Sequence, residues 1–447
     1  MIKKILSAFL LVAITITLSS CSHPDPETEK LTYYALKEDV KGEEWFYSLI
    51  QKYNKYCLKN LDESYQIEVV TFDSESEMNL KISTEIMAGG GPDILNTNQK
   101  LPFEKLIENG SLLNIDTLFE NDKTYIYNCN QTVMQAGVFD GERYIIPLYY
   151  KVDYLVSSES KLENLNITSE NGIAFVYDEI DEIFENFINA RDDISFFDNQ
   201  YGGSYFIDVN DFFYSFINSY IDFENKQVYF DTEEFRNALP YMKELVSKVN
   251  KEKTDSSHND YLFYDFYSTA SPRILSGVYA RLSDEGEKLV VTRGFLRDAY
   301  VYSGNIQMGI AFNSNTKYRD KASEFIKYAL SEDVQGYFIG LNSRNNFVQL
   351  NFPVNNNTYK SLKEKSNEYT DDFGDVIGYG ASDNEFIQNC FEMAENIKEC
   401  SIYENLNNTY FGTSVIGEIV QNYLTDSISE DKFIWRLTSA TKMYMLE

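Results

Sequence analysis

The chain has 447 residues, of which 43% are hydrophobic and 15% aromatic. This composition excludes a disordered chain, and the length indicates more than one folding unit. Its 70 acidic residues outnumber 39 basic ones, so the formal net charge is −31 and phosphate backbones would repel it. We therefore expect no nucleic-acid partner.

The N-terminus has the pattern of an export signal. Two lysines precede an apolar run at 5–18 that is too short to span a bilayer comfortably. The run ends in "LSSC" (18–21), which resembles the lipobox of bacterial lipoproteins. We therefore predict a signal peptide at 1–20, a lipidated Cys21 that carries palmitate or a related chain, and a tether at 21–30. The alternative is an ordinary signal peptide with an incidental cysteine.

The next segments alternate between strand and helix patterns. We expect strands at 31–36, 65–72 and 93–95, and helices at 43–61 and from a capping box at 74–77 to the glycines at 89–91. The order β-α-β-α-β predicts an α/β fold with a parallel sheet and crossover helices.

Three consecutive glycines, 89–91, separate the second helix from the third strand. Glycine permits the left-handed conformation that ends many helices, so at least one of them should have a positive φ. A phosphate-binding loop is rejected, because such loops lie between a strand and the helix that follows it.

Further along, Asp140-Gly141 predicts a hairpin turn, and helical spacing recurs at 180–190 and 231–249. Pro240 lies inside the second of these helices and predicts a kink or a late start. Residues 309–339 have the pattern of a strand and two helices, and the last 60 residues that of helices.

Four cysteines follow Cys21, which is too few for a disulfide framework in so long a chain. Cys390 and Cys400 lie in a run with a helical pattern, where ten residues would hold them too far apart to bridge. We expect four buried free thiols. Trp45 and Trp435 lie on or beside helical stripes, and we predict that both are core residues.

Several segments, in this order along the chain, resemble the family 1 extracellular solute-binding proteins of ABC importers, the group that contains maltose-binding protein. They are "ISTEIMAGGGPDIL", "KLIENGSLLNID", "FDGERYIIPLYYKVDYLV", "FDTEEFRNALPYMKEL", "AFNSNTKYRDKASEFIKYALSEDVQ" and "FPVNNN".

The resemblance implies a two-domain periplasmic-binding-protein-like fold of type II, with two α/β lobes, hinge strands between them and ligand in the cleft. It places the N-terminal lobe at 31–150 plus 298–351, and the C-terminal lobe at 151–297 plus 352–447. It also implies a monomer at the outer face of the cell membrane that delivers its ligand to the membrane subunits of an ABC permease.

Ligands of open α/β sheets bind beyond the carboxyl ends of the strands. Glu38 follows the first predicted strand, Asp73 the second, and Asn96 and Asn98 the third, so these four are candidate ligand-binding residues. Their carboxylates and amides can hydrogen-bond sugar hydroxyls.

A sugar ring also needs an aromatic platform. The resemblance places Tyr279 and Arg281 of "SGVYAR", and Phe411 or its neighbour Tyr410, near the ligand; Tyr149 lies at the predicted crossover between lobes. For each aromatic residue, packing within a lobe remains the alternative.

Catalytic and metal-binding signatures are missing from the sequence. Its two histidines, His23 and His258, have no partners in a metal-binding spacing, and no nucleophile-elbow, Walker or dinucleotide motif occurs. We expect no cofactor, no metal and no enzymatic activity.

The sequence thus predicts a lipoprotein that captures a small solute, with an oligosaccharide preferred over a peptide or another polar solute. A sensor lipoprotein of the same fold remains an alternative. So does a carbohydrate-active enzyme, because a catalytic carboxylate pair could be formed from so many acidic residues.

Overall fold

The computed structural model describes most of the chain between Lys30 and Leu446. The described residues are 30–99, 101–119, 123–152, 154–164, 174–176, 195–197, 209–222, 225–252, 261–263, 265–267, 288–296, 303–339, 351–365, 369–370, 376–378, 385–402 and 415–446. Cys21, its tether and the predicted helix at 180–190 lie outside them.

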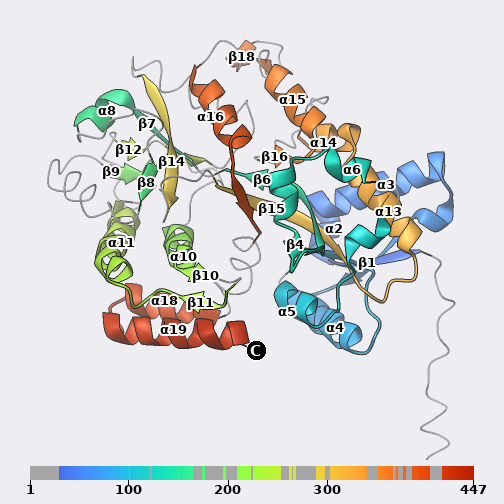
Figure 1. Cartoon of the computed structure of the whole chain (residues 1–447), viewed down its shortest axis with the longest axis horizontal. Coiled ribbons are helices and arrows are strands. Elements are labelled where there is room, and N and C mark those ends of the chain that lie inside the picture. Colours follow the sequence, from blue (N-terminus) through green and yellow to red (C-terminus); the bar gives the residue numbers. More distant parts are fainter. Residues whose placement is uncertain are drawn as a thin grey trace, which may run out of the picture.

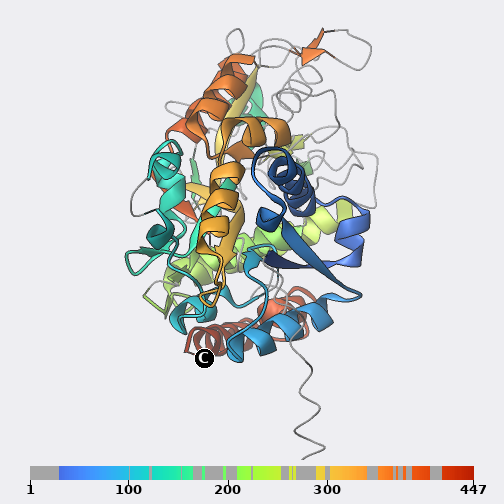
Figure 2. The same ribbon diagram turned by 90° about the vertical axis from the view of Figure 1, so that its right-hand side faces the viewer.

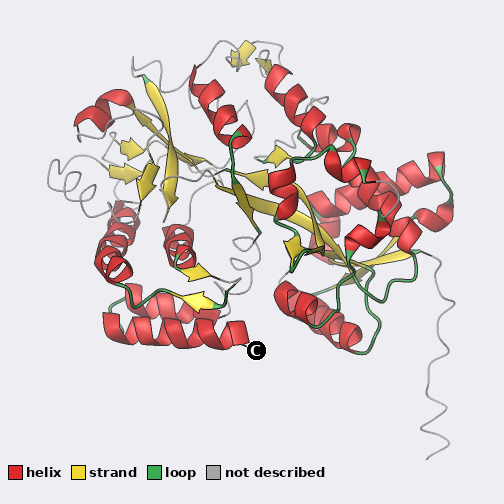
Figure 3. Cartoon of the chain, viewed as in Figure 1, coloured by secondary structure: helices red, strands yellow, loops and turns green. Residues whose placement is uncertain are grey.

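Two lobes lie side by side, each around its own hydrophobic cluster (Figure 1). Most of the first cluster comes from residues 31–152 and 306–402, and most of the second from 213–246 and 416–445. Figure 3 shows helices packed around the strands of both lobes. The predicted two-lobe α/β fold is confirmed.

A seven-stranded mixed sheet forms the centre of the first lobe. Its main path runs β16-β6-β15-β3-β1-β2, and β19 pairs with β15 beside this path. β1 is parallel to β2 and β3, whereas β15 is antiparallel to β3 and β6. The strands are β1 (Leu31–Leu36), β2 (Ile67–Phe72), β3 (Ile94–Asn96), β6 (Ile145–Lys151), β15 (Ser303–Phe312), β16 (Phe352–Pro353) and β19 (Glu399–Ser401).

Helices cover this sheet, and Figure 2 looks onto α3 and α13 on the outer side of the lobe. Tyr53 of α3 packs on Phe325 and Tyr328 of α13, with ring centroids 5.0 and 5.1 Å apart. The helices are α2 (Lys37–Lys41), α3 (Trp45–Asn60), α4 (Glu75–Met87), α5 (Phe103–Glu108), α6 (Thr124–Tyr127), α7 (Gln131–Gln135), α13 (Arg319–Ala329), α14 (Glu332–Phe338), α15 (Asn356–Lys365) and α16 (Glu385–Glu395). Short 3₁₀ turns lie at Glu63–Tyr65 and Ile115–Leu118.

The beginning and end of α4 agree with the sequence. The Ser74 hydroxyl accepts a hydrogen bond from the Glu77 N–H at 3.2 Å, which satisfies one donor of the first turn. At the other end, Gly89 has φ +81° and Gly91 has φ +95°, while the Gly90 N–H donates to the Glu85 carbonyl. The glycines therefore end the helix and lead the chain into β3.

The chain passes between the lobes along strands. β6 ends at Lys151 in the first sheet, and β7 begins at Tyr154 in a four-stranded sheet of the second lobe, of order β13-β7-β14-β8. The return runs from β14 to β15. The strands of the second lobe are β7 (Tyr154–Ser158), β8 (Ala174–Val176), β9 (Ser195–Phe197), β10 (Ile221–Asp222), β11 (Gln227–Val228), β12 (Tyr261–Phe263), β13 (Asp265–Tyr267) and β14 (Leu289–Leu296).

Five described helices pack around the second core or against its sheet: α8 (Glu159–Asn164), α10 (Val209–Ser219), α11 (Glu233–Glu252) and the C-terminal pair α18 (Gly417–Leu424) and α19 (Glu430–Leu446). Small antiparallel pairs complete the chain: β4 (Val138–Phe139) with β5 (Glu142–Arg143), β10 with β11, and β17 (Tyr369–Thr370) with β18 (Val376–Gly378). The predicted turn at Asp140-Gly141 joins β4 to β5, and both of its residues have positive φ.

α11 begins at Glu233, before Pro240, so the helix does not start late, and the alternative of a kink at Pro240 stays a prediction. The predicted helix through both Cys390 and Cys400 is wrong. The helix that contains Cys390 ends at Glu395, and Cys400 lies in β19, where it pairs with Gly304 of β15. All four cysteines are free; three are buried and Cys400 is half-buried.

The predicted lobe boundaries stay a prediction. Described segments after residue 352 still pack in the first lobe. Leu362 of α15 and Phe386 of α16 are buried in the first cluster, and β19 pairs within the first sheet. The next described segment, which begins at Val415 and includes α18, packs in the second cluster.

Candidate functional site

The carboxyl ends of β1 and β2 lie next to each other, because Leu36 is paired with Phe72 in parallel register. The residues that follow meet: the Lys37 ammonium donates to the Asp73 carboxylate at 2.8 Å. Glu38 and Asp73 are both exposed. The two carboxylates predicted from the strand ends therefore share one solvent-facing edge of the sheet, which we call the strand-end edge (residues 37–39, 73 and 96–99).

The loop after β3 is held by a buried amide network. Asn96 is 4% exposed, and its side-chain oxygen accepts from the Asn98 N–H at 2.9 Å. The Gln99 side chain accepts from the Asn96 N–H and donates to the Tyr34 carbonyl. Asn96 thus shapes the loop, whereas Asn98 at its tip is exposed. Of the two predicted amides, only Asn98 is exposed to solvent.

Thr97 ties this loop to the strand that returns from the second lobe. Its hydroxyl accepts from the Gly309 N–H at 2.8 Å, and its own N–H donates to the Gly309 carbonyl at 3.1 Å. These two bonds join the loop after β3 directly to β15.

Asp39 of α2 adds a carboxyl that the sequence analysis missed. Burial raises its pKa, a hydrogen bond with the Leu36 backbone opposes this, and the negative charges of Glu38 and Glu75 raise it further. The Asp39 carboxylate has therefore lost part of its hydration, and a hydrogen-bond donor from a bound solute would replace the lost water. Only its position beside Glu38 signalled it in the sequence.

Tyr33 lies beneath the same edge. It is 5% exposed; burial raises the pKa of its hydroxyl, while a hydrogen bond with the Asn96 side chain lowers it. Tyr33 therefore stays neutral and supports the loop after β3 from below.

Tyr149 occupies a different place. It is 1% exposed and packs edge-on against Trp45, with ring centroids 4.9 Å apart and an interplanar angle of 89°. This position matches the packing alternative for Tyr149. Trp45, at 8% exposure, is a core residue as predicted.

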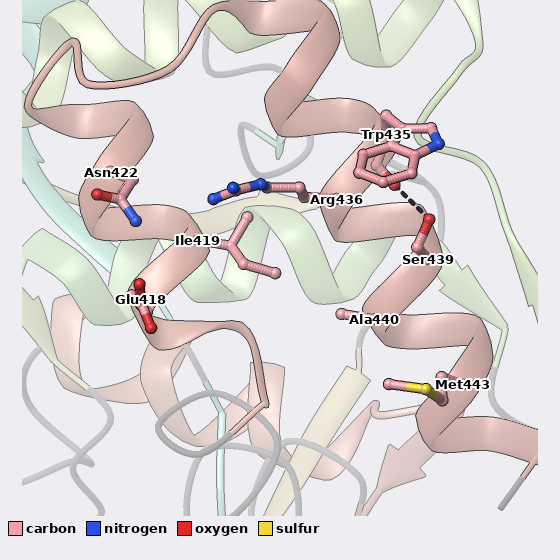
Figure 4. Close-up of a pocket in the computed structure, with 8 residues that line it drawn as sticks. All are labelled: Glu418, Ile419, Asn422, Trp435, Arg436, Ser439, Ala440 and Met443. Carbon is pink, nitrogen blue, oxygen red and sulfur yellow. Dashed lines mark hydrogen bonds between the residues drawn. The ribbon is translucent and has the colours of Figure 1, made fainter.

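Tyr279, Arg281 and Phe411 lie outside the described residues, so the half of the site that the second lobe would supply stays a prediction. The described part of the second lobe has a surface pocket of about 340 Å³ between α18 and α19 (Figure 4). Its lining residues are Glu418, Ile419, Asn422, Trp435, Arg436, Ser439, Ala440 and Met443.

Trp435 is 67% exposed in this pocket, so its predicted place in the core is wrong. The buried stripe of α19 includes Phe433, Ile434, Leu437 and Tyr444. Trp435 lies beside this stripe, on the solvent side of the helix.

Among the described residues, no group of three or more His, Cys, Asp or Glu side chains could hold a metal ion. None of the described helices is both long and apolar enough to cross a membrane.

Solved structures share this fold at low sequence identity. The sugar-binding protein MalE from Xanthomonas citri has a TM-score of 0.55 and 13% identity, over 93% of this chain and 97% of that one. The cyclic alpha-maltosyl-1,6-maltose binding protein from Arthrobacter globiformis gives 0.53 and 13%, over 93% and 98%. An ABC transporter solute-binding protein from Thermotoga lettingae, bound with alpha-D-tagatose, gives 0.52 and 14%, over 93% and 99%.

A comparison with curated proteins found no match. Residues 40–336, about two thirds of the chain, match the family of bacterial extracellular solute-binding proteins. That span begins in α2, next to the strand-end edge, and ends in α14 of the same lobe, so it includes the passage from β6 to β7 and the return from β14 to β15. The chain therefore belongs to the bacterial extracellular solute-binding protein family.

Proposed function

We propose that this protein captures an oligosaccharide outside the cytoplasm and delivers it to an ABC permease, while a lipid on Cys21 anchors it to the membrane. The observation that carries the proposal is the strand-end edge. There, the first lobe presents exposed carboxylates and an exposed amide at the carboxyl ends of neighbouring strands, where ligands of α/β sheets bind.

The chemistry of this edge suits a polyhydroxylated ligand. The carboxylates of Glu38, Asp39 and Asp73 accept hydrogen bonds, Lys37 donates them, and the Asn98 amide does both. A sugar presents many hydroxyls that act as donors and acceptors at once. Tyr279, Arg281 and Phe411 would supply the apolar platform and a guanidinium from the second lobe.

The similar structures support a sugar as the ligand class, since they include a cyclic alpha-maltosyl-1,6-maltose binding protein and a protein bound with alpha-D-tagatose. They do not favour one sugar for this chain. A binding role without turnover fits the family and the lack of a catalytic motif.

A thermal-shift screen of the purified protein against mono- and oligosaccharides tests the proposal. A ligand at 100 times its dissociation constant stabilises the fold by about 2.7 kcal/mol, which raises the melting temperature by a few degrees. The saccharide in each positive mixture should remain intact after long incubation. Its hydrolysis would favour the enzyme alternative.

Variants of the edge then locate the site. Asp73→Asn and Asn98→Ala should each weaken binding of the saccharide found in the screen by about two- to tenfold. Asp73→Asn replaces a charge-assisted hydrogen bond with a weaker neutral one, and Asn98→Ala removes a hydrogen bond worth about 0.5–1.5 kcal/mol. Glu364→Gln changes an exposed carboxylate on α15, away from the edge, and should leave affinity unchanged. Normal affinity in both edge variants would place the ligand elsewhere.

A further inference from the structure

The two lobes touch at a second place besides the strands that connect them. α5 of the first lobe faces the turn between β10 and β11 and the end of α19 in the second lobe (Figure 1). Here the Lys226 ammonium lies 2.5 Å from the Glu108 carboxylate. The two side chains are 45% and 51% exposed, so water weakens this ion pair without abolishing it.

A second contact lies beside the first. The Tyr444 hydroxyl donates to the Glu104 carboxylate at 3.1 Å, and the Lys105 ammonium lies 5.6 Å from the centroid of the Tyr444 ring. Tyr444 is 8% exposed and belongs to the second core, while α5 is fixed in the first core by Phe103. Each side chain of this contact is therefore anchored in its own lobe.

We propose that Glu104 and Glu108 of α5, together with Lys226 and Tyr444 of the second lobe, form a latch that holds the lobes in contact without ligand. Each of these contacts joins protein to protein, so the latch requires no solute. In a protein whose lobes are connected by strands, such a contact sets the fraction of molecules that are closed before binding.

The buried carboxylate of Glu104 opposes contact between the lobes. One oxygen of Glu104 is buried and has no hydrogen-bond partner in the described part of the chain. Burial is the main cause that raises the pKa of Glu104, and the charge of Glu108 adds to it; Tyr444, Lys105 and Lys226 act in the other direction. Contact thus costs hydration energy whenever the Glu104 carboxylate is charged.

The sign of the pH dependence follows from this. When the lobes separate, water reaches Glu104 and its pKa falls towards the ordinary value. The contact state therefore binds a proton more readily than the separated state. As the pH falls from neutral through the raised pKa, the contact state becomes more favoured.

Spin labels on the two lobes measure the latch in ligand-free protein. Leu80→Cys on α4 and Ser439→Cys on α19 provide exposed label sites, and Cys400→Ser removes the half-buried native thiol. The interlobe distance distribution then gives the ratio of contact to separated molecules. Lys226→Glu and Glu108→Lys should each lower this ratio by about two- to tenfold, since each replaces an attraction with a repulsion. The double reversal should restore it.

The matched control is Lys363–Glu395, an ion pair 2.8 Å long with similar exposure that joins two helices of the first lobe. Its reversal should not change the distribution. The proposal would be overturned if the wild type, the two single reversals and the double reversal had equal distance distributions. It would also be overturned if the double reversal did not recover the wild-type ratio.

Glu104→Gln separates the charge from the hydrogen bond. The amide oxygen can still accept from Tyr444, whereas the buried charge is gone. The variant should have more contact molecules than the wild type at about pH 7.5 and should lose the rise that the wild type shows towards about pH 5.5. A wild-type ratio that stays flat or falls on acidification contradicts the role of Glu104. Because every measurement is made without ligand, the latch can fail while the proposed function stands, and the reverse.

Discussion

Tyr149 and Tyr150 are neighbours on β6 and are both 1% exposed, but their hydroxyls have different surroundings. Burial raises the pKa of both hydroxyls. Tyr150 hydrogen-bonds with the Asn130 side chain, whereas the Tyr149 hydroxyl has no hydrogen-bond partner in the described part of the chain. A buried hydroxyl without a partner reduces stability, and a satisfied one does not.

Tyr149→Phe should therefore increase the free energy of unfolding by about 1 kcal/mol, because it removes a polar group that lost its water on folding. Tyr150→Phe is the matched control and should decrease stability by about 0.5–1.5 kcal/mol. Urea titration of both variants measures the difference. A loss of stability in Tyr149→Phe would mean that the hydroxyl has a partner, for example a buried water.

Asp39 provides a pH test at the strand-end edge. Its pKa is raised in the folded protein, so the ionised carboxylate lowers stability at pH values above that raised pKa. Asp39→Asn should therefore be more stable than the wild type near neutral pH. The advantage should shrink as the pH falls through the raised pKa, where the wild-type carboxyl becomes neutral too. Denaturant midpoints at a series of pH values check this, and a difference that does not depend on pH would argue against desolvation of Asp39.

The candidate residues show what sequence can predict at this scale. Glu38, Asp73 and Asn98 follow from one rule, that the ends of parallel strands meet at one edge, and the structure exposes all three there. Asn96 and Tyr149 also carry groups that can hydrogen-bond a sugar, but neighbours distant in sequence bury both of them. Asp39 was missed for the same reason, since burial by other segments cannot be read from local pattern.

At the scale of elements, strong local sequence patterns predicted the structure correctly. Weak patterns failed where a segment pairs with a strand that is distant in sequence. The apolar stripe of α3 and the capping box of α4 are each formed by residues close together in the sequence, so both could be predicted. β19 is three residues long and exists because it pairs with β15, about a hundred residues earlier in the chain. A helical pattern that runs through Cys400 carries no sign of that partner.

The glycines after α4 give a prediction for a single element boundary. Gly91→Ala should cost about 1–2 kcal/mol of stability, because an L-residue is strained at a positive φ. Its new Cβ would also lie 3.2 Å from Ile86 Cγ1. Gly90→Ala is the control; Gly90 does not have a positive φ, and the nearest atom would be 3.7 Å away.

Thermal and urea unfolding of the two glycine variants measure stability, and calorimetry with the saccharide from the screen measures affinity. We expect unchanged affinity in the folded fraction of both, because these glycines serve the helix end. A weaker affinity at normal stability would show instead that the loop contacts the ligand.

For the whole molecule, the anchoring proposal depends on Cys21. Cys21→Ala should abolish labelling with a radioactive or clickable fatty acid and leave the protein unprocessed or released from membranes, because the acyl chains supply the membrane affinity. Cys400→Ala changes a cysteine of the folded part and should be labelled as the wild type is. Equal lipid labelling of the Cys21 variant would refute the lipoprotein assignment.

The latch and the proposed ligand act on the same equilibrium between lobes in contact and lobes apart. If the latch already closes most molecules, a saccharide that bridges the lobes has little left to close, and the radius of gyration of the wild type should fall only slightly on binding. Lys226→Glu should start from a larger radius and fall further, towards the liganded wild-type value.

The same coupling predicts affinity. In Lys226→Glu, part of the binding energy is used to close the lobes, so the dissociation constant should rise by the factor by which the closed fraction falls. That factor is at most the change in the ratio of contact to separated molecules, about two- to tenfold. The double reversal with Glu108→Lys should restore both the radius and the affinity, and reversal of Lys363 should change neither. Small-angle scattering and calorimetry on the same four proteins measure the two quantities. An affinity that stays constant while the ligand-free radius changes would show that the contact between α5 and the second lobe is not part of the closure that follows ligand binding.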